Sequence, residues 1–158
     1  MEELDIEQIT RLILDGMENG SSLDFIKKCQ ESGFLTKEPQ PNVGQYDALP
    51  SFDQIYQYSF LSPNTINSFL EIIVVKKKLI QIGAHFHYER SFLFNPAKAT
   101  FNRGNEILES YFGTGYLTKS KNFINYNYGY GELLGYISLI KMNIYGVIFK
   151  VAKAEAYH

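Results

Sequence analysis

Two histidines and a glutamate stand at alternate positions in the middle of the chain, as His85, His87 and Glu89. Residues two apart project from the same face of a β-strand, and two imidazoles with a carboxylate are a ligand set for zinc or non-haem iron. Same-face neighbours lie about 7 Å apart, so His85 and His87 can share an ion, but the third ligand has to come from elsewhere. A metal-dependent or small-molecule-binding enzyme is therefore an alternative function. The leading prediction is a chain that uses no metal and no cofactor.

Three tyrosines also recur at every second position, as Tyr126, Tyr128 and Tyr130. This spacing predicts a strand with three phenol rings on one face. Such a row can pack at the margin of a sheet, or it can form a contact surface, because tyrosine combines a large rigid apolar area with a hydroxyl that tolerates water. Glu132 follows directly, in a Tyr-Gly-Tyr-Gly-Glu turn. We interpret these four residues as protein-binding candidates, with sheet packing as the alternative for the tyrosines.

Aromatic side chains on a sheet can also stack on single-stranded bases. Such a site needs clustered lysines and arginines for the phosphates. Only Lys119 and Lys121 lie near the tyrosines in sequence, and the whole chain has three arginines. Single-stranded RNA binding is therefore a third function class, and nucleic acid is not the expected partner.

The first third of the chain carries the patterns of two short amphipathic helices. Asp5 and Gln8 are spaced as in a capping box, directly before apolar residues at helical spacing. A second helix is predicted from Ser21 or Ser22 to a glycine stop at Gly33.

Prolines and a glycine among polar residues then predict an extended connector over 36–50. The chain has the usual length of a single domain. We therefore predict one domain over 1–158, with a helical N-terminal part over 1–35, the connector, and a mixed part of sheet and helix over 51–158.

Residues 51–75 carry signals for both helix and strand. Ser62-Pro63 is typical of a helix start, with proline at the first helical position. Tyr56 and Tyr58 instead alternate with polar residues, as in a strand. Both interpretations of this segment stay open.

The patterns are clearer in the second half of the chain. Residues 78–89 alternate as an amphipathic strand, and Asn95-Pro96 opens a longer helix that ends at Phe112. The stretch over 122–154 predicts three antiparallel strands. The expected fold is α+β: two N-terminal helices, then an antiparallel sheet of four to six strands with the helix of about 95–112 packed on one face.

The setting is predicted from cysteine usage and hydropathy. Cys29 is the single cysteine, which excludes an internal disulfide, and no basic start followed by an apolar run stands at the N-terminus. No apolar run approaches the roughly 20 residues that cross a membrane as a helix. We expect a cytoplasmic protein without a membrane-spanning segment.

Charge divides the chain into two unequal parts. Eleven acidic and four basic residues lie before Leu61, and six acidic and eleven basic residues follow. An acidic, tyrosine-bearing surface suits a basic protein partner. Small acidic inhibitors, such as the bacterial immunity proteins that neutralise toxic nucleases, have this chemistry as a class. The leading prediction is therefore a non-catalytic protein-binding module that blocks a basic partner such as a toxin domain.

Overall fold

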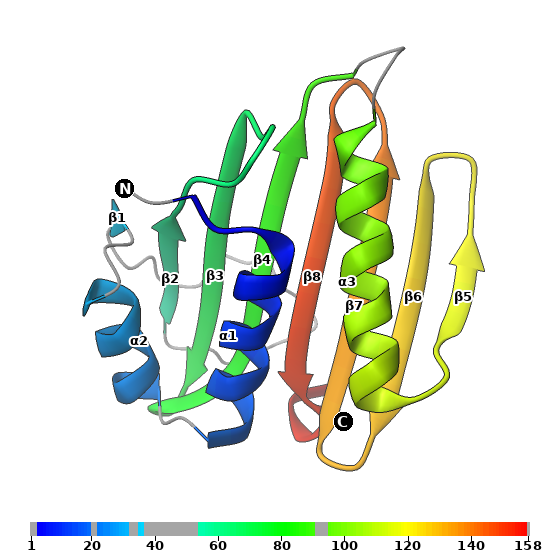
Figure 1. The fold of residues 1–158 in the computed structure, drawn as a ribbon. Coiled ribbons are helices and arrows are strands. Elements are labelled where there is room, and N and C mark those ends of the chain that lie inside the picture. The colour runs from blue at the N-terminus through cyan, green and yellow to red at the C-terminus, as the bar shows by residue number, and fades with distance from the viewer. Residues whose placement is uncertain (1–2, 20–21, 32–34, 37–53, 91–94, 158) are drawn as a thin grey trace.

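One antiparallel sheet, with helices on one of its faces, organises the chain (Figure 1). The computed structural model describes residues 3–19, 22–31, 35–36, 54–90 and 95–157. Its strands are β1 (Leu35–Thr36), β2 (Gln54–Ser59), β3 (Asn67–Val75), β4 (Lys78–Tyr88), β5 (Tyr116–Lys119), β6 (Phe123–Tyr130), β7 (Leu133–Lys141) and β8 (Tyr145–Lys153). Its helices are α1 (Ile6–Asn19), α2 (Ser22–Glu31), α3 (Pro96–Phe112) and the short 3₁₀ helix η1 (Ala154–Tyr157).

Two antiparallel meanders form the sheet. The strands lie in the order β1-β2-β3-β4-β8-β7-β6-β5, so the last strand of each meander meets the other at the centre. Ala84 of β4 stands opposite Phe149 of β8, for example. The helix α3 connects the meanders and runs along the face of the second one (Figure 1).

The α+β class is confirmed, but the predicted number of four to six strands is wrong. The sheet has seven strands of four residues or more, together with the two-residue β1. Of the two interpretations left open for 51–75, the helix start at Ser62-Pro63 is wrong, because Thr65 N donates to Ser62 O across a turn and β3 follows. β3 pairs with β2 on one side and with β4 on the other, which satisfies its backbone groups as a strand. Tertiary pairing thus overrides the local helix signal.

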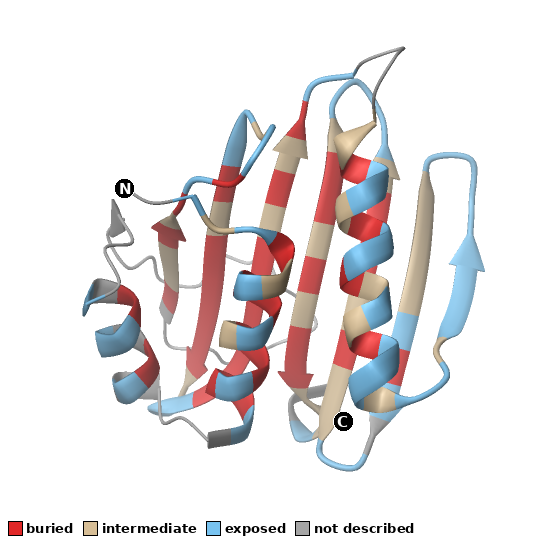
Figure 2. Ribbon diagram, viewed as in Figure 1, coloured by how far each residue is buried: buried red, intermediate tan, exposed pale blue. Residues whose placement is uncertain are grey.

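The core lies between the sheet and the helices. Ile9 and Ile13 of α1 and Leu108 of α3 are fully buried against the sheet. Buried residues are concentrated in the central strands and on the inward sides of the helices (Figure 2). The predicted placement of the helices is therefore incomplete, because α1 shares with α3 the face that was assigned to the helix of about 95–112 alone. We call this the helix face, and the opposite one the second face.

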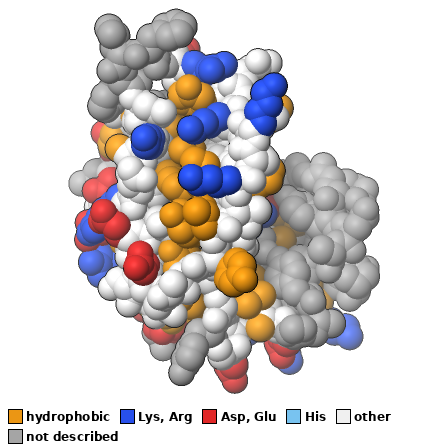
Figure 3. Space-filling model, turned by 90° about the vertical axis from the view of Figure 1, so that its right-hand side faces the viewer, with side chains coloured by type: hydrophobic (Ala, Val, Ile, Leu, Met, Phe, Trp, Pro, Cys, Tyr) orange, Lys and Arg blue, Asp and Glu red, His pale blue; other side chains and the backbone are white. Residues whose placement is uncertain are grey.

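Strand β5 forms an exposed edge of the sheet. All four of its residues are exposed, with 81% of Tyr116 and 45% of Leu117 accessible to solvent. Hydrophobic side chains form a column down this side of the molecule, with basic side chains beside its upper part (Figure 3). Lys119 at the end of the strand limits edge-to-edge pairing, as charged residues commonly do on edge strands.

Two sequence predictions are not resolved by this fold. The connector predicted over 36–50 lies outside the described residues from residue 37 onward, and the single-domain organisation stays a prediction.

None of the helices in the described parts of the chain has both the length and the apolar character needed to cross a lipid bilayer.

The turn between β3 and β4 gives a test of local backbone strain. Lys76 and Lys77 form it, with φ of 48° and 65°, a region that favours glycine. We expect Lys77→Gly to raise the free energy of unfolding by about 0.5–1 kcal/mol, because the left-handed conformation disfavours side chains with a Cβ. Lys78→Gly, in the adjoining strand, should lower it by a similar amount. Equilibrium urea unfolding would contradict this explanation if both variants changed stability in the same direction.

Candidate functional site

Two residues of the tyrosine row, Tyr126 and Tyr128, lie on the helix face, under α3. Tyr128 is only 4% exposed, and its hydroxyl donates a hydrogen bond to Asn105 of α3. The Tyr128 and Phe112 ring centroids are 6.1 Å apart, and those of Tyr126 and Phe101 are 6.0 Å apart. Tyr126 and Tyr128 therefore share a face as predicted, but that face is packed against a helix.

Tyr128 is packed between the sheet and α3, as in the sheet-packing alternative, and its ring is not exposed at the surface. After α3 the chain passes against its ring at Gly115, where a Cβ would lie 2.5 Å from Tyr128 Cε1. Burial raises the pKa of Tyr128 to about 12. Because the Tyr128 ring is covered, it offers no free face on which an RNA base could stack. The backbone of Tyr130 continues β6, while its side chain lies outside the described residues.

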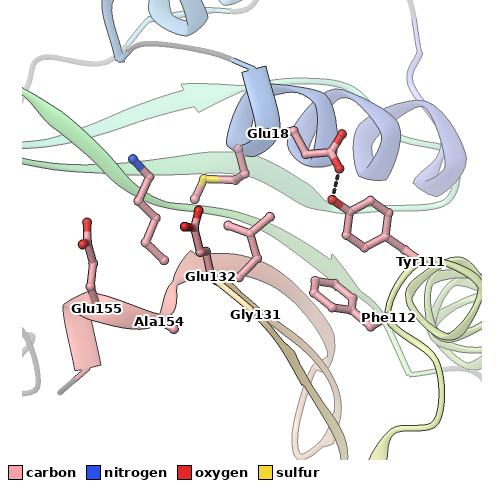
Figure 4. A pocket seen from close by; sticks show the side chains of 10 residues that line it. Glu18, Tyr111, Phe112, Gly131, Glu132, Ala154 and Glu155 are labelled. Carbon is pink, nitrogen blue, oxygen red and sulfur yellow. Dashed lines mark hydrogen bonds between the residues drawn. The ribbon is translucent and has the colours of Figure 1, made fainter.

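Glu132 is exposed and borders a hollow of about 990 Å³ at the end of the molecule where α1, α3 and β8 finish (Figure 4). We call it the acidic hollow. Its lining residues are Met17, Glu18, Tyr111, Phe112, Gly131, Glu132, Leu133, Lys153, Ala154 and Glu155. Glu132 is the one residue of the four predicted to bind a protein that is among these lining residues.

A turn and a short helix build one side of the acidic hollow. Gly131 has a φ of 65°, which lets the chain reverse tightly between β6 and β7 and leaves Glu132 at the rim. The backbone N–H of Ala154 donates to the Glu132 carbonyl oxygen at 2.8 Å, which holds η1 against the turn. Glu132 and Glu155 therefore belong to the same side of the hollow (Figure 4).

A hydrogen bond between two helix ends builds the opposite side. The Tyr111 hydroxyl of α3 donates to Glu18 Oε1 of α1 (Figure 4). Burial, and then this hydrogen bond, raise the pKa of Tyr111 to about 12, so the hydroxyl keeps its proton at neutral pH. The Tyr111 ring meets that of Phe112 edge to face at a centroid distance of 4.7 Å. An aromatic wall thus stands beside the Glu18 carboxylate.

The electrostatics of the acidic hollow favour a cation. Among its described lining residues, Lys153 is the single base against three glutamates. The last turns of α1 and α3 end at the hollow, and neither contains a basic residue. Helix C-termini carry partial negative charge, which adds to that of the carboxylates. The arrangement can hold a lysine or arginine side chain beside aromatic rings, where cation–π contact adds to charge attraction.

The predicted metal ligands are not assembled within the described residues. The His85 ring stacks on Phe69 of β3 at a centroid distance of 4.6 Å, and His87 meets the same ring edge to face at 6.0 Å. Glu89 is exposed beyond the end of β4. The described parts of the chain contain no group of three or more His, Cys, Asp or Glu side chains placed to hold a metal ion. The two histidines pack against an aromatic ring on the second face.

Sequence reasoning missed Glu18, Tyr111 and Glu155. Glu18 and Tyr111 are 93 residues apart, so their contact depends on how α1 lies beside α3. One local signal was available for part of the site, because the helix patterns end without a basic residue in the last turn. Glu155 has no such signal, since only the docking of η1 on the turn brings it to the hollow.

Relatives of known function would supply an independent argument about the acidic hollow. The chain was therefore compared with protein families, curated proteins and solved structures, and none of these comparisons finds a match.

Proposed function

We propose that this chain is a non-catalytic protein-binding module: a small cytoplasmic inhibitor of the immunity-protein type that blocks a basic partner, such as a bacterial toxin domain. The acidic hollow carries the proposal. Glu18, Glu132 and Glu155 surround a space of about 990 Å³ that is open to a partner. Charge complementarity of this kind directs association and selects the partner.

The walls of the hollow support a side chain of a protein as the bound cation. Met17, Phe112 and Leu133 supply apolar surface, and Tyr111 supplies an aromatic ring with a fixed hydroxyl. Lysine and arginine have an apolar stem and a charged head, so they match a site that combines apolar walls with carboxylates. If the inserted lysine or arginine is one that the partner uses to bind its own ligand, the insertion blocks that binding.

The binding residues of this proposal differ from the tyrosine row. Glu132 is retained, whereas Tyr126 and Tyr128 serve to pack α3 on the sheet. The proposed contact set is Glu132, Glu155 and the hydrogen-bonded pair of Tyr111 and Glu18.

The test begins with the protein encoded by the neighbouring gene, because toxin inhibitors are commonly encoded beside their toxins. We expect it to be basic and to bind this chain. The double variant Glu132→Gln/Glu155→Gln should weaken the affinity by about 10- to 100-fold, with slower association and a smaller dependence on salt. Isothermal titration and stopped-flow measurements would give the affinity and the association rate.

The matched control is Glu31→Gln/Glu89→Gln, which removes two exposed carboxylates outside the hollow. It should leave the affinity within about twofold of wild type, since isolated surface charges contribute little. Equal weakening by both double variants would show a general charge effect and exclude the hollow as the binding site. A neighbouring protein that is acidic, or that does not bind, would contradict the inhibitor proposal.

A further inference from the structure

A second pocket, of about 310 Å³, opens on the second face of the sheet. We propose that it binds a small organic anion with a flat apolar body, such as an aromatic carboxylate. The side chains that the argument uses are Gln81, Asn127, Leu134, Tyr136, Lys150 and Ala152. The pocket shares no lining residue with the acidic hollow, so the proposal is independent of the function proposed above.

Strand register explains why a depression forms here. Gln81 of β4, Ala152 of β8 and Leu134 of β7 stand opposite one another in one row across the sheet. The next row contains Lys150 opposite Tyr136, both with longer side chains. Ala152 projects only a methyl group between its two neighbours in the row. The pocket therefore has a low apolar floor beside a taller wall.

The wall presents one positive charge at a defined place. The Lys150 ammonium lies 5.8 Å from the centroid of the Tyr136 ring. On its other side the stem of Lys150 passes Gly83, where a Cβ would lie 3.3 Å from Lys150 Cγ. Lys150 thus lies between Gly83 and Tyr136 in the lining of the pocket, where its ammonium can donate charge-assisted hydrogen bonds to a carboxylate or sulfonate.

The strands that line the pocket contain no opposing charge, because β4, β6, β7 and β8 have no aspartate or glutamate in their described spans. Glu71 of β3 stands in the row of Lys150, on the far side of Gly83, and does not line the pocket. Lys150 is the one charged side chain among the described residues that line the pocket. Gln81 and Asn127 contribute neutral amides to the lining, and the exposed amide of Asn127 can orient a polar ligand. An anion is therefore favoured here, whereas the acidic hollow favours a cation.

The apolar part of the ligand follows from the floor and the volume. Leu134 and Ala152 form the floor, and the Tyr136 ring offers an aromatic side. Pockets for small ligands span roughly 300–1,000 Å³, so this one lies at the lower end of that range. A molecule of one or two fused rings with one acidic group matches both the size and the charge.

The probe for this site is 8-anilinonaphthalene-1-sulfonate, a fluorescent aromatic anion. We expect saturable binding of one probe per chain. Lys150→Met should weaken it at least tenfold, while Lys141→Met, which removes an exposed lysine at the end of β7, should leave it unchanged. Ala152→Phe should abolish binding by filling the floor. Near-UV circular dichroism of each variant would establish that it is folded.

A competition experiment separates charge from hydrophobicity. Naphthalene-2-carboxylate should displace the probe, whereas its neutral carboxamide should displace it at least tenfold less well. Equal displacement by both, or equal affinity in Lys150→Met and Lys141→Met, would overturn the anion site. If Ala152→Phe does not fold, the lysine pair and the competition still decide the outcome.

Discussion

The Tyr128→Ala variant is expected to lose about 3–5 kcal/mol of the free energy of unfolding, as buried aromatic residues commonly do when truncated to alanine. Tyr128 is 4% exposed, and its ring packs beside those of Phe112 and Tyr126. Truncation would leave a cavity between α3 and β6 and would remove the hydroxyl that donates to Asn105. Equilibrium urea unfolding, followed by far-UV circular dichroism, measures this loss.

Tyr116→Ala is the matched control, because Tyr116 is 81% exposed on the neighbouring strand of the same hairpin. Its effect should stay within about 0.5 kcal/mol of wild type. Tyr128→Phe isolates the hydroxyl and should cost about 1–2 kcal/mol, since Asn105 then loses its donor. A Tyr128→Ala variant no less stable than Tyr116→Ala would disprove the packed arrangement.

This expectation changes how a binding assay has to be designed. A partner that no longer binds Tyr128→Ala would report lost folding rather than a lost contact, because the ring does not reach the surface. Glu132 and Glu155 are exposed, so their substitution changes charge at the surface of the acidic hollow without opening a core cavity. Partner binding is therefore tested with these glutamates and with stability measured in parallel.

The elements with regular periodicity were predictable, but their environment was not. Helical spacing predicts a helix over 95–112, and the structure has Pro96–Phe112. A period of two likewise places Tyr126 and Tyr128 on one side of a strand. Which side is covered depends on where α3 lies, and no local pattern contains that information. The covered side is identified only in the folded chain, where Tyr128 of β6 contacts Asn105 of α3, 23 residues away in sequence.

The strand count was wrong for two different reasons. β5 has only four residues, all exposed, so it lacks the alternation of apolar and polar residues that reveals a strand. At Ser62-Pro63 a local helix signal was present but lost to pairing of β3 on both sides. For β5 the sequence carries no strand signal. At Ser62-Pro63 it carries a helix signal, but the long-range hydrogen bonds of β3 outweigh that signal.

The candidate site was predictable only at Glu132. That residue follows a glycine turn whose geometry is local, and Gly131 does adopt the positive φ that such a turn requires. Glu18, Tyr111 and Glu155 reach the hollow through the packing of α1 on α3 and of η1 on the turn. Long-range juxtaposition of this kind is not encoded in spacing along the chain.

His85 should make the stability of the protein depend on pH. Burial, followed by the charges of Lys150 and His87, lowers the pKa of His85 from 6.5 to about 4. Its Nε2 is shielded from solvent and has no hydrogen-bond partner among the described residues. The unfolded chain therefore binds a proton on this residue at a higher pH than the folded chain does. Protonation favours unfolding, so stability is retained above about pH 6.5 and is lost as the pH falls toward 4.

The expected loss attributable to His85 is about 2 kcal/mol between pH 7 and pH 5, because its pKa is lowered from 6.5 to about 4. His85→Phe keeps an aromatic ring against Phe69 and removes the titrating group, so its stability should vary less over this range by that amount. His87→Phe is the matched control, since it alters the other histidine beside the same ring. Urea unfolding of the three proteins at half-unit steps of pH measures the difference. An unchanged slope in His85→Phe, or an equal change in His87→Phe, would show that the second face does not hold His85 as a neutral, half-buried imidazole. The ring would then be accessible to protons and to ligands.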